Sequence, residues 1–349
     1  MRAAVYRGPG MLRVEDIPVP RIGPGEMLVR VEACGVCGTD IKKVERGLLA
    51  PPRVFGHETA GVVARTGAGV TRFSEGQRVA LHHHIPCGSC FYCSLKAHAQ
   101  CETYKKNGTT AGFEPAGGGM AEYVRVMDWI VDRGTIAVPD GVLAEEAAFV
   151  EPVNTCLKAV KGAGLGKGQT VLVVGQGPIG LLLMQLARWS GAGVITSDTL
   201  SSRLEASRRL GADVVLDARG DVAQEVRGLT DGRGADVALL AAVGQAAFDQ
   251  AVAATRPAAR IVVFAATSPG ESVSADLGAL CRAEKQLLTS YSASVEVQDL
   301  AAQLVFSREI RVRELISHRF PLEAAAQAFE VAAKPAPAVL KVVVEMARP

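Results

Sequence analysis

Four cysteines that lie close together in the chain are suited to hold a metal ion. Cys87, Cys90, Cys93 and Cys101 follow the spacing Cys-x2-Cys-x2-Cys-x7-Cys, and four thiolates on a short loop can form the tetrahedron that structural zinc requires. All four ligands come from the protein, so such a site has no open position for a substrate. We therefore predict a structural zinc lobe over about residues 86–102 and expect the chemistry to lie elsewhere.

This cysteine cluster is also compatible with an iron–sulfur cluster or with disulfides. The sequence Cys-x2-Cys-x2-Cys opens the bacterial ferredoxin motif as well, although here the last gap is longer and Glu102 follows instead of proline. Paired disulfides are disfavoured by the lack of a secretory signal at the N-terminus. A colourless protein would exclude the iron–sulfur alternative.

A second group of residues offers a thiolate, an imidazole and a carboxylate. Cys37 lies in the segment 34–40, and the pair His57-Glu58 follows a glycine. These ligand types suit a zinc ion that keeps one position open for a substrate. Taken alone, these residues are equally compatible with a buried cysteine and a core histidine that bind no metal. Their occurrence in one chain with the four-cysteine motif favours the metal site.

A glycine-rich turn predicts a dinucleotide site. The motif G-x-G-x-x-G directly follows a strand predicted over residues 170–174 and opens a predicted helix, which is the context that gives the motif meaning. Its glycines make the turn, let the backbone approach a pyrophosphate and allow close helix–strand packing. The helix N-terminus then favours the anion. The residues predicted to contact the cofactor here are Gly175, Gly177, Pro178, Ile179 and Gly180.

An acidic residue after the next predicted strand indicates which cofactor binds. Asp198 can accept hydrogen bonds from both ribose hydroxyls and would repel a 2′-phosphate, which favours NAD over NADP. Arg203 favours NADP instead, because an arginine near the ribose can accommodate a phosphate. We expect Asp198 to decide, since it ends the strand. The alternative is that the glycines only close a turn and Asp198 only caps a helix.

Together these motifs resemble the zinc-dependent medium-chain dehydrogenase/reductase family, and most of all its sorbitol (polyol) and threonine dehydrogenase branch. The resemblance covers essentially the whole chain. In order, it rests on GVCGTD at 35–40, GHE at 56–58, the cysteine lobe, Glu151-Pro152 and GxGPIG at 175–180. It implies an α/β fold with a GroES-like β-rich catalytic domain and a Rossmann domain whose parallel sheet is doubly wound.

The resemblance also implies roles for residues around the catalytic metal. Cys37 and His57 would bind the zinc, with Glu58 as a direct or exchanging ligand. Alcohol dehydrogenases of the family have a third cysteine where this chain has Glu151, which would bind the zinc or hold its water. Asp40 would orient His57 through the other ring nitrogen.

Four further residues are implied to act on substrate or cofactor. Thr39 would take the proton of the bound alcohol, and Thr155 would touch the nicotinamide. Lys341 would either pair with the glutamate near the metal or approach the cofactor phosphates. Many relatives have a relay histidine where this chain has Lys42, which would pass protons or bind an anionic substituent, unless it is simply solvated. With Lys43 and Arg46 it forms a small basic group, which leaves a phosphorylated or acidic polyol open.

The elements that must position these residues change in character along the chain. Up to about residue 149, short β-type runs alternate with Gly and Pro and predict an irregular β-domain. From residue 170 strands alternate with helices, which implies βαβ units and a parallel sheet. The strands are predicted at 170–174, 194–197, 214–216, 237–240, 261–264 and 286–291, with helices at 179–190, 203–210 and 248–255. The last elements, helices at 297–306 and 322–332 and strands at 315–320 and 340–345, are assigned back to the first domain.

Length and composition limit the remaining choices. The 349 residues suggest about two domains, which we place at 1–150 with 293–349 and at 151–292. With 21% charged residues and a net charge of +2, the chain has no basic or acidic block that would indicate nucleic acid. Its apolar runs are too short for a membrane span. We expect a cytoplasmic homo-oligomer, by analogy a tetramer or dimer, with a small alcohol or ketone as its partner.

The sequence thus predicts an NAD-dependent zinc enzyme with two zinc ions per chain. It would transfer a hydride between NAD and a secondary alcohol of a polyol, cyclitol or amino-alcohol, giving a ketone. A primary or short-chain alcohol dehydrogenase and a sugar-phosphate dehydrogenase are alternatives with the same chemistry. A non-catalytic NAD-binding structural or regulatory protein is the alternative of a different class.

Overall fold

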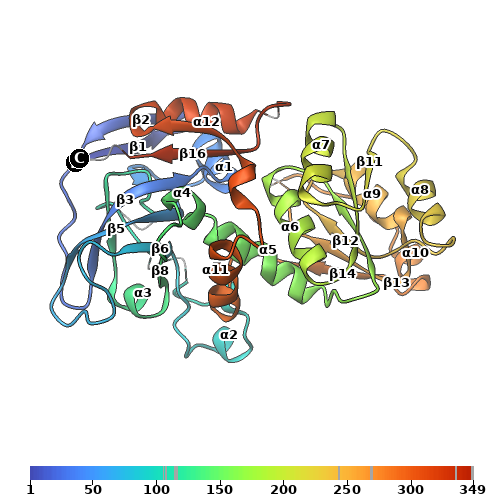
Figure 1. The fold of residues 1–349 in the computed structure, drawn as a ribbon, viewed down its shortest axis with the longest axis horizontal. Coiled ribbons are helices and arrows are strands. Elements are labelled where there is room, and N and C mark those ends of the chain that lie inside the picture. The colour runs from blue at the N-terminus through green and yellow to red at the C-terminus, as the bar shows by residue number, and fades with distance from the viewer. Residues whose placement is uncertain are drawn as a thin grey trace. The chain divides into compact units, whose positions relative to one another are not determined.

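The computed structural model describes residues 1–104, 106, 108–113, 117–242, 244–267, 270–334 and 336–346. It divides into two compact units, Met1–Asn154 with Ala293–Pro349, and Thr155–Ser292. The blue and red ends of the chain therefore belong to one unit (Figure 1). The sequence predicts the first boundary after residue 150. The division falls after residue 154, inside one continuous helix, α5 (Val150–Gly162).

The first unit is built on two sheets. A three-stranded sheet has the order β2-β1-β4, and a seven-stranded sheet has the order β15-β16-β3-β5-β6-β8 with β7 also paired to β3. The strands are β1 (Arg2–Gly8), β2 (Met11–Asp16), β3 (Met27–Gly35), β4 (Arg53–Val54), β5 (Glu58–Thr66), β6 (Arg78–His82), β7 (Tyr123–Val126), β8 (Thr135–Ala137), β15 (Ile316–Pro321) and β16 (Lys341–Glu345). Strand β16 pairs with β3, so the C-terminal segment completes the sheet that carries the site.

Short helices connect these strands. They are α1 (Gly38–Arg46), α2 (Phe91–Ser94), η1 (His98–Gln100), α3 (Asp128–Arg133), α4 (Ala144–Ala147), η2 (Val295–Val297), α11 (Gln298–Phe306), η3 (Val312–Leu315), η4 (Leu322–Ala324) and α12 (Ala325–Ala333). Helix α1 ends at Gly47, whose φ of +64° is the left-handed conformation that glycine adopts without strain.

The second unit is a parallel sheet with helices on both faces, as predicted. Its strand order is β11-β10-β9-β12-β13-β14, and every pairing is parallel. The strands are β9 (Thr170–Val174), β10 (Gly193–Asp198), β11 (Val214–Asp217), β12 (Ala235–Leu240), β13 (Thr255–Val263) and β14 (Gln286–Thr289). The helices are α6 (Pro178–Trp189), α7 (Ser201–Leu210), α8 (Val222–Gly228), α9 (Gln245–Ala254) and α10 (Leu277–Arg282). Helices α6 and α7 cover one face, and α8 and α9 lie on the other (Figure 1).

The order in which the chain adds strands to this sheet reverses at β9: β10 and β11 lie on one side of it, and β12 to β14 lie on the other. Ligands bind at this point in doubly wound folds. Strand β9 is an almost unbroken apolar run, Thr-Val-Leu-Val-Val, because a central parallel strand is buried on both faces. Helix α6 begins with Pro178 at its first position, where the missing N–H costs no hydrogen bond. The carboxyl end of β9 and the start of α6 thus frame the predicted nucleotide turn.

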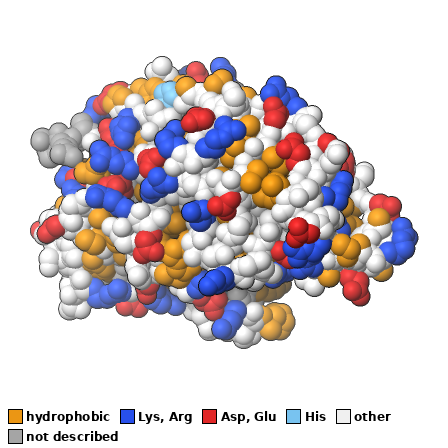
Figure 2. Space-filling model, turned by 45° about the vertical axis from the view of Figure 1, so that its right-hand side comes forward, with side chains coloured by type: hydrophobic (Ala, Val, Ile, Leu, Met, Phe, Trp, Pro, Cys, Tyr) orange, Lys and Arg blue, Asp and Glu red, His pale blue; other side chains and the backbone are white. Residues whose placement is uncertain are grey.

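The surface carries charges of both signs. On the face shown in Figure 2, basic and acidic side chains are interspersed, so that face offers no continuous basic stripe for a phosphate backbone. Among the described residues, every helix is too short or too polar to cross a bilayer.

An ion pair around a buried carboxylate links β7 to the residue before β3. Glu26 directly precedes β3, and Arg125 in β7 donates to both its oxygens, from Nε at 2.9 Å and Nη2 at 2.5 Å. The Gly23 amide donates to Glu26 Oε2 at 2.6 Å. Burial would raise the pKa of Glu26, but these hydrogen bonds hold it below its ordinary value. The charged carboxylate therefore stabilises the folded state.

Replacing Glu26 should destabilise the fold in a pH-dependent manner. Glu26→Gln should lose about 1–3 kcal/mol of unfolding free energy at neutral pH, because it weakens a buried bidentate pair. The carboxylate's contribution is present above its unfolded pKa of about 4.3 and disappears as the pH falls through the lower folded value. Urea unfolding from neutral to acid pH should therefore show the two proteins converging.

The control for this experiment is Glu15→Gln. It breaks the solvent-exposed pair with Arg7 and should cost less than about 1 kcal/mol. A Glu26→Gln deficit that stays constant into acid would show that the charge of Glu26 is not its source.

Candidate active site and metal centres

Three predicted ligands of the catalytic metal lie together. Cys37 immediately precedes α1, and His57 and Glu58 lie where the chain enters β5. One ligand atom from each lies within 4.8 Å of the others, and His57 and Glu58 are buried. A thiolate, an imidazole and a carboxylate at such separations fit zinc with a fourth position left for a substrate.

Gly56 lets the chain turn tightly before these ligands. Its φ is +100°, and a Cβ there would lie 2.7 Å from Cys34 Sγ and 2.8 Å from the Met120 amide nitrogen. Any side chain would therefore push the loop out of place. The glycine of the GHE motif is thus needed to bring His57 and Glu58 to Cys37.

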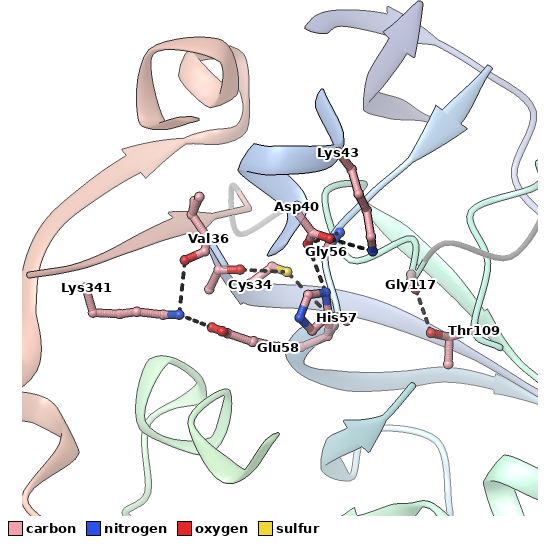
Figure 3. Close-up of polar contacts among 12 residues, drawn as sticks. Cys34, Val36, Asp40, Lys43, Gly56, His57, Glu58, Thr109, Gly117 and Lys341 are labelled. Carbon is pink, nitrogen blue, oxygen red and sulfur yellow. Dashed lines mark hydrogen bonds and ion pairs between the residues drawn. The ribbon is translucent and has the colours of Figure 1, made fainter. Parts of the chain in front are cut away.

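Asp40 holds the histidine, as the resemblance implied. It is fully buried, and its Oδ2 lies 2.9 Å from His57 Nδ1 and accepts from the Gly56 amide at 3.2 Å (Figure 3). A carboxylate on Nδ1 keeps the proton there and leaves Nε2 available to a metal. Burial would lower the pKa of His57, but Asp40 and Cys37 raise it well above its ordinary value. Burial likewise opposes ionisation of Asp40, yet His57 and Lys43 lower its pKa.

Lys341 is the cation that pairs with Glu58, the carboxylate of this group. It is buried in β16, forms an ion pair with Glu58, and donates from Nζ to the Val36 carbonyl at 3.1 Å (Figure 3). Burial would lower the pKa of Lys341, but Glu58 and Cys37 raise it. Of the two roles considered for Lys341, the structure contains the pairing with the glutamate near the metal.

Glu151 lies outside the three-ligand group. It is in the first turn of α5 and half-buried, and it is not among the residues with ligand atoms within 4.8 Å of each other. Burial raises its pKa to about 7, against the opposing charges of His57 and Lys341. The charges of the site therefore affect the pKa of Glu151, although its carboxyl group is not within 4.8 Å of all three ligand atoms.

Four other residues of this unit bear on the group through their position or contacts. Thr39 is exposed in the first turn of α1, and Lys42 is half-buried on the same helix. Two further residues make contacts that the sequence did not predict. Lys43 pairs with Asp40 at 3.2 Å, and the buried ring of His83 lies 4.7 Å from that of His57. The three-residue spacing from Asp40 on a helix was the available signal for Lys43.

The four cysteines of the lobe also come together. One sulfur from each lies within 4.8 Å of the others, with Cys93 Sγ 3.9 Å from that of Cys87 and 3.6 Å from that of Cys90. Sulfurs placed tetrahedrally about 2.3 Å from zinc are about 3.8 Å apart, so these distances fit the ion. All eight cysteines of the chain are free thiols, and pairing as disulfides is not what the structure shows.

The lobe's thiols are held by hydrogen bonds. The Cys90 amide donates to Cys87 Sγ at 3.4 Å and the Cys87 amide to Cys101 Sγ at 3.3 Å. Hydrogen bonds from Ser89 lower the pKa of Cys87 to about 5, whereas burial raises that of Cys93 to about 12. A cation bound at the four sulfurs would keep them all deprotonated.

The glycine turn of the second unit has the geometry that a pyrophosphate requires. Gly175 has φ of +88°, and Gly177 is the residue before α6, where a Cβ would meet only Arg203 Nη1, at 3.9 Å. A Cβ on Gly180 would overlap the Gly175 carbonyl oxygen. The first turn of α6, which also contains Pro178 and Ile179, can therefore pack against the turn only with glycine at this position.

Asp198 ends β10 beside this turn. Its Oδ2 accepts from the Gln176 amide at 2.6 Å and its Oδ1 from the Leu200 amide at 2.8 Å. Arg203 Nη1 lies 3.8 Å from Asp198 Oδ2, and its Nε is buried without a hydrogen-bond partner among the described residues. Thr155 is half-buried on α5, in the same unit. Through its bonds to the Gln176 and Leu200 amides, the Asp198 carboxylate thus also connects the glycine turn to the loop after β10.

The chain matches models of two protein families. Residues 23–140 match the alcohol dehydrogenase GroES-like domain and residues 178–307 match the zinc-binding dehydrogenase family. It is 32% identical over 278 residues to sorbitol dehydrogenase of Bacillus subtilis (strain 168), covering 78% of this chain and 76% of that enzyme. It is 31% identical over 375 residues to alcohol dehydrogenase of Cupriavidus necator, covering 99% and 98%. A zinc-binding dehydrogenase of Sinorhizobium meliloti 1021, solved with NADP, superposes with a TM-score of 0.89 at 30% identity, covering 99% and 98%.

The two metal centres should be separable by mutation. Wild type should contain about two zinc ions per chain. Cys37→Ser should lower this to about one and abolish activity with little loss of thermal stability. Cys93→Ser should also leave about one but lower the unfolding temperature, because the buried residues that pack within the lobe are its cysteines and Tyr104. Elemental analysis and thermal unfolding measure both.

Cys281→Ser is the control, since this cysteine is exposed and belongs to neither group of metal ligands. It should keep both ions. Retention of about two zinc ions by Cys37→Ser would contradict the assignment of the catalytic site.

Proposed function

The chain belongs to the zinc-dependent medium-chain dehydrogenase/reductase family, in its sorbitol dehydrogenase-like branch, and we propose that it oxidises a secondary alcohol of a polyol, cyclitol or amino-alcohol to a ketone. The predicted fold class, a GroES-like domain with a Rossmann sheet, is confirmed. So is the prediction of an NAD-dependent zinc enzyme that acts on alcohols or polyols. The choice among substrates is the part we propose.

One observation carries the proposal: Cys37, His57 and Glu58 converge around one point, with His57 oriented by a buried aspartate. We assign these ligands, together with Glu151, to the catalytic zinc. The glutamate that replaces a cysteine of the alcohol dehydrogenases supports the polyol branch. A carboxylate here also accepts hydrogen bonds, which a polyol can donate from its additional hydroxyl groups.

The reaction divides between the bound groups and the chain. When bound, zinc supplies a Lewis acid at the substrate oxygen and NAD supplies the hydride acceptor. Thr39, exposed in the first turn of α1, accepts the alcohol proton at its hydroxyl oxygen while its own hydroxyl proton leaves. Lys42, one turn farther along the helix, takes up that proton as the free amine, and the resulting ammonium releases a proton to solvent. Asp40 keeps His57 in one tautomer throughout.

The cofactor site follows from the second unit. We assign Gly175, Gly177, Pro178, Ile179, Gly180, Asp198, Arg203 and Thr155 to the cofactor. The NAD preference is supported by the Asp198 carboxylate, because a 2′-phosphate beside it would meet like charge. Arg203, whose Nη1 lies 3.8 Å from Asp198 Oδ2, is the residue that could accommodate a phosphate. The Sinorhizobium relative was solved with NADP, so comparing NAD⁺ with NADP⁺ tests this preference.

We also propose a cytoplasmic homo-oligomer, a tetramer in preference to a dimer. Two separate apolar surfaces support it. Strand β14 is an edge of the six-stranded sheet and leaves Leu287 43% exposed, while the zinc lobe leaves Phe91 67% and Leu95 61% exposed. A reducing compartment suits eight free thiols, of which four are arranged for a metal.

A panel of alcohols tests the proposed substrate. NADH formation should show the highest kcat/KM with a secondary alcohol of a polyol, cyclitol or amino-alcohol, because extra hydroxyl or amino groups offer hydrogen bonds that a simple alcohol lacks. NADP⁺ in place of NAD⁺ should lower kcat/KM at least about tenfold. Faster turnover of primary alcohols or sugar phosphates would overturn the proposal in favour of those substrates.

The oligomer proposal predicts separate effects at the two surfaces. Light scattering with size exclusion should give the molar mass of a tetramer for wild type. Leu287→Lys and Phe91→Glu should each reduce it to a dimer, because each places a charge in one interface. Leu229→Lys, at an equally exposed leucine outside both surfaces, should leave the mass unchanged. A monomeric wild type would contradict the proposal.

A further inference from the structure

The carboxylate that orients His57 is shared with a lysine. Asp40 Oδ2 receives His57 Nδ1 and the Gly56 amide, while Asp40 Oδ1 lies 3.2 Å from Lys43 Nζ (Figure 3). Asp40 is fully buried, so both of its ionic partners act through little water. One carboxylate therefore serves two partners, the ammonium of Lys43 and the imidazole of the predicted metal ligand His57.

Lys43 is held in this position by the fold. It lies three residues after Asp40 on α1, so the two side chains share one face of the helix. Its ammonium lies 5.6 Å from the ring centroid of Phe55, which is fully buried, and its side chain is only 27% exposed. An ammonium fixed by an ion pair and an aromatic ring is not a solvated lysine. The sequence grouped Lys43 with Lys42 and Arg46 as a basic patch, but Lys43 turns to Asp40.

This sharing has an electrostatic consequence for the metal site. A carboxylate that interacts with the imidazole alone makes that imidazole a stronger base and therefore a stronger metal ligand. An ammonium on the other oxygen opposes this, and its own charge repels a divalent ion at Cys37, His57 and Glu58. Both effects act in the same direction. They weaken binding of the cation and leave more of its charge to polarise a substrate oxygen.

We propose that Lys43 tunes the catalytic metal site through Asp40, lowering the affinity for the ion and raising its power as a Lewis acid. This inference rests on the proposed function, because it needs a metal at Cys37, His57 and Glu58. It makes Lys43 a positioning and charge-setting residue that acts on the metal ligands through Asp40. The competing role for Lys43 is only to hold Asp40 in place.

The two roles predict opposite changes in metal affinity. The catalytic ion is removed from the full-length protein with a chelator and replaced by titration with Co²⁺, followed by its visible absorption. Lys43→Met keeps the length of the side chain and removes the charge. If Lys43 tunes the site, Co²⁺ should bind about three- to tenfold more tightly, while kcat of the reconstituted enzyme falls severalfold.

Three variants serve as controls. Lys43→Arg keeps the positive charge and should retain the wild-type affinity. Arg65→Met removes an exposed charge from β5 and should change neither affinity nor kcat, because solvent screens it. Asp40→Asn removes the partner of His57 and should weaken Co²⁺ binding. The four-cysteine lobe provides an internal test of folding, since its zinc content should be equal in all the proteins.

Any different result overturns the inference. Weaker Co²⁺ binding by Lys43→Met, with the lobe intact, would show that Lys43 merely holds Asp40. Unchanged binding would show that its charge does not reach the site. Absence of a second metal site in wild type would overturn the proposed function itself, and the tuning role with it.

Discussion

The hydrogen bond between Asp40 and His57 is the interaction on which the site depends. A fully buried carboxylate is costly unless charged or polar groups surround it, and here His57, Lys43 and the Gly56 amide do so. These partners come from α1 and from the turn before β5. The same contacts that satisfy Asp40 therefore fix the helix after Cys37 against the strand that begins at Glu58. The contacts that stabilise the charge of Asp40 therefore also hold Cys37, His57 and Glu58 close together.

A second buried pair ties the end of the chain to its beginning. Lys341 in β16 meets Glu58 in β5, and β16 extends the sheet beside β3. Either charge alone would be strongly unfavourable in the interior. The return of the C-terminal segment to the first unit is thus part of the site, because without β16 the Glu58 carboxylate would lack its cation.

The sequence was most informative where chemistry restricts the residue type. Glycine is required at Gly56 by neighbouring atoms and at Gly180 by a carbonyl oxygen, and the apolar run of β9 reflects burial on both faces. Such constraints are local and therefore visible in a motif. The partners of Lys341 and Lys43, and the approach of His83 to His57, depend on which strands and turns meet in space. No spacing specifies these contacts, although Lys43 at three residues from Asp40 was a hint.

The two groups of predicted metal ligands differ in how the protein neutralises an ion. The lobe presents four sulfurs, whose combined charge exceeds that of a divalent cation, and its amide donors from Cys87 and Cys90 offset the excess. The catalytic group presents a thiolate and a carboxylate, and Lys341 already takes part of the charge of Glu58. A cation there meets fewer negative charges and retains more of its own field. The closed lobe therefore suits permanent binding, while the open group suits polarisation of a substrate.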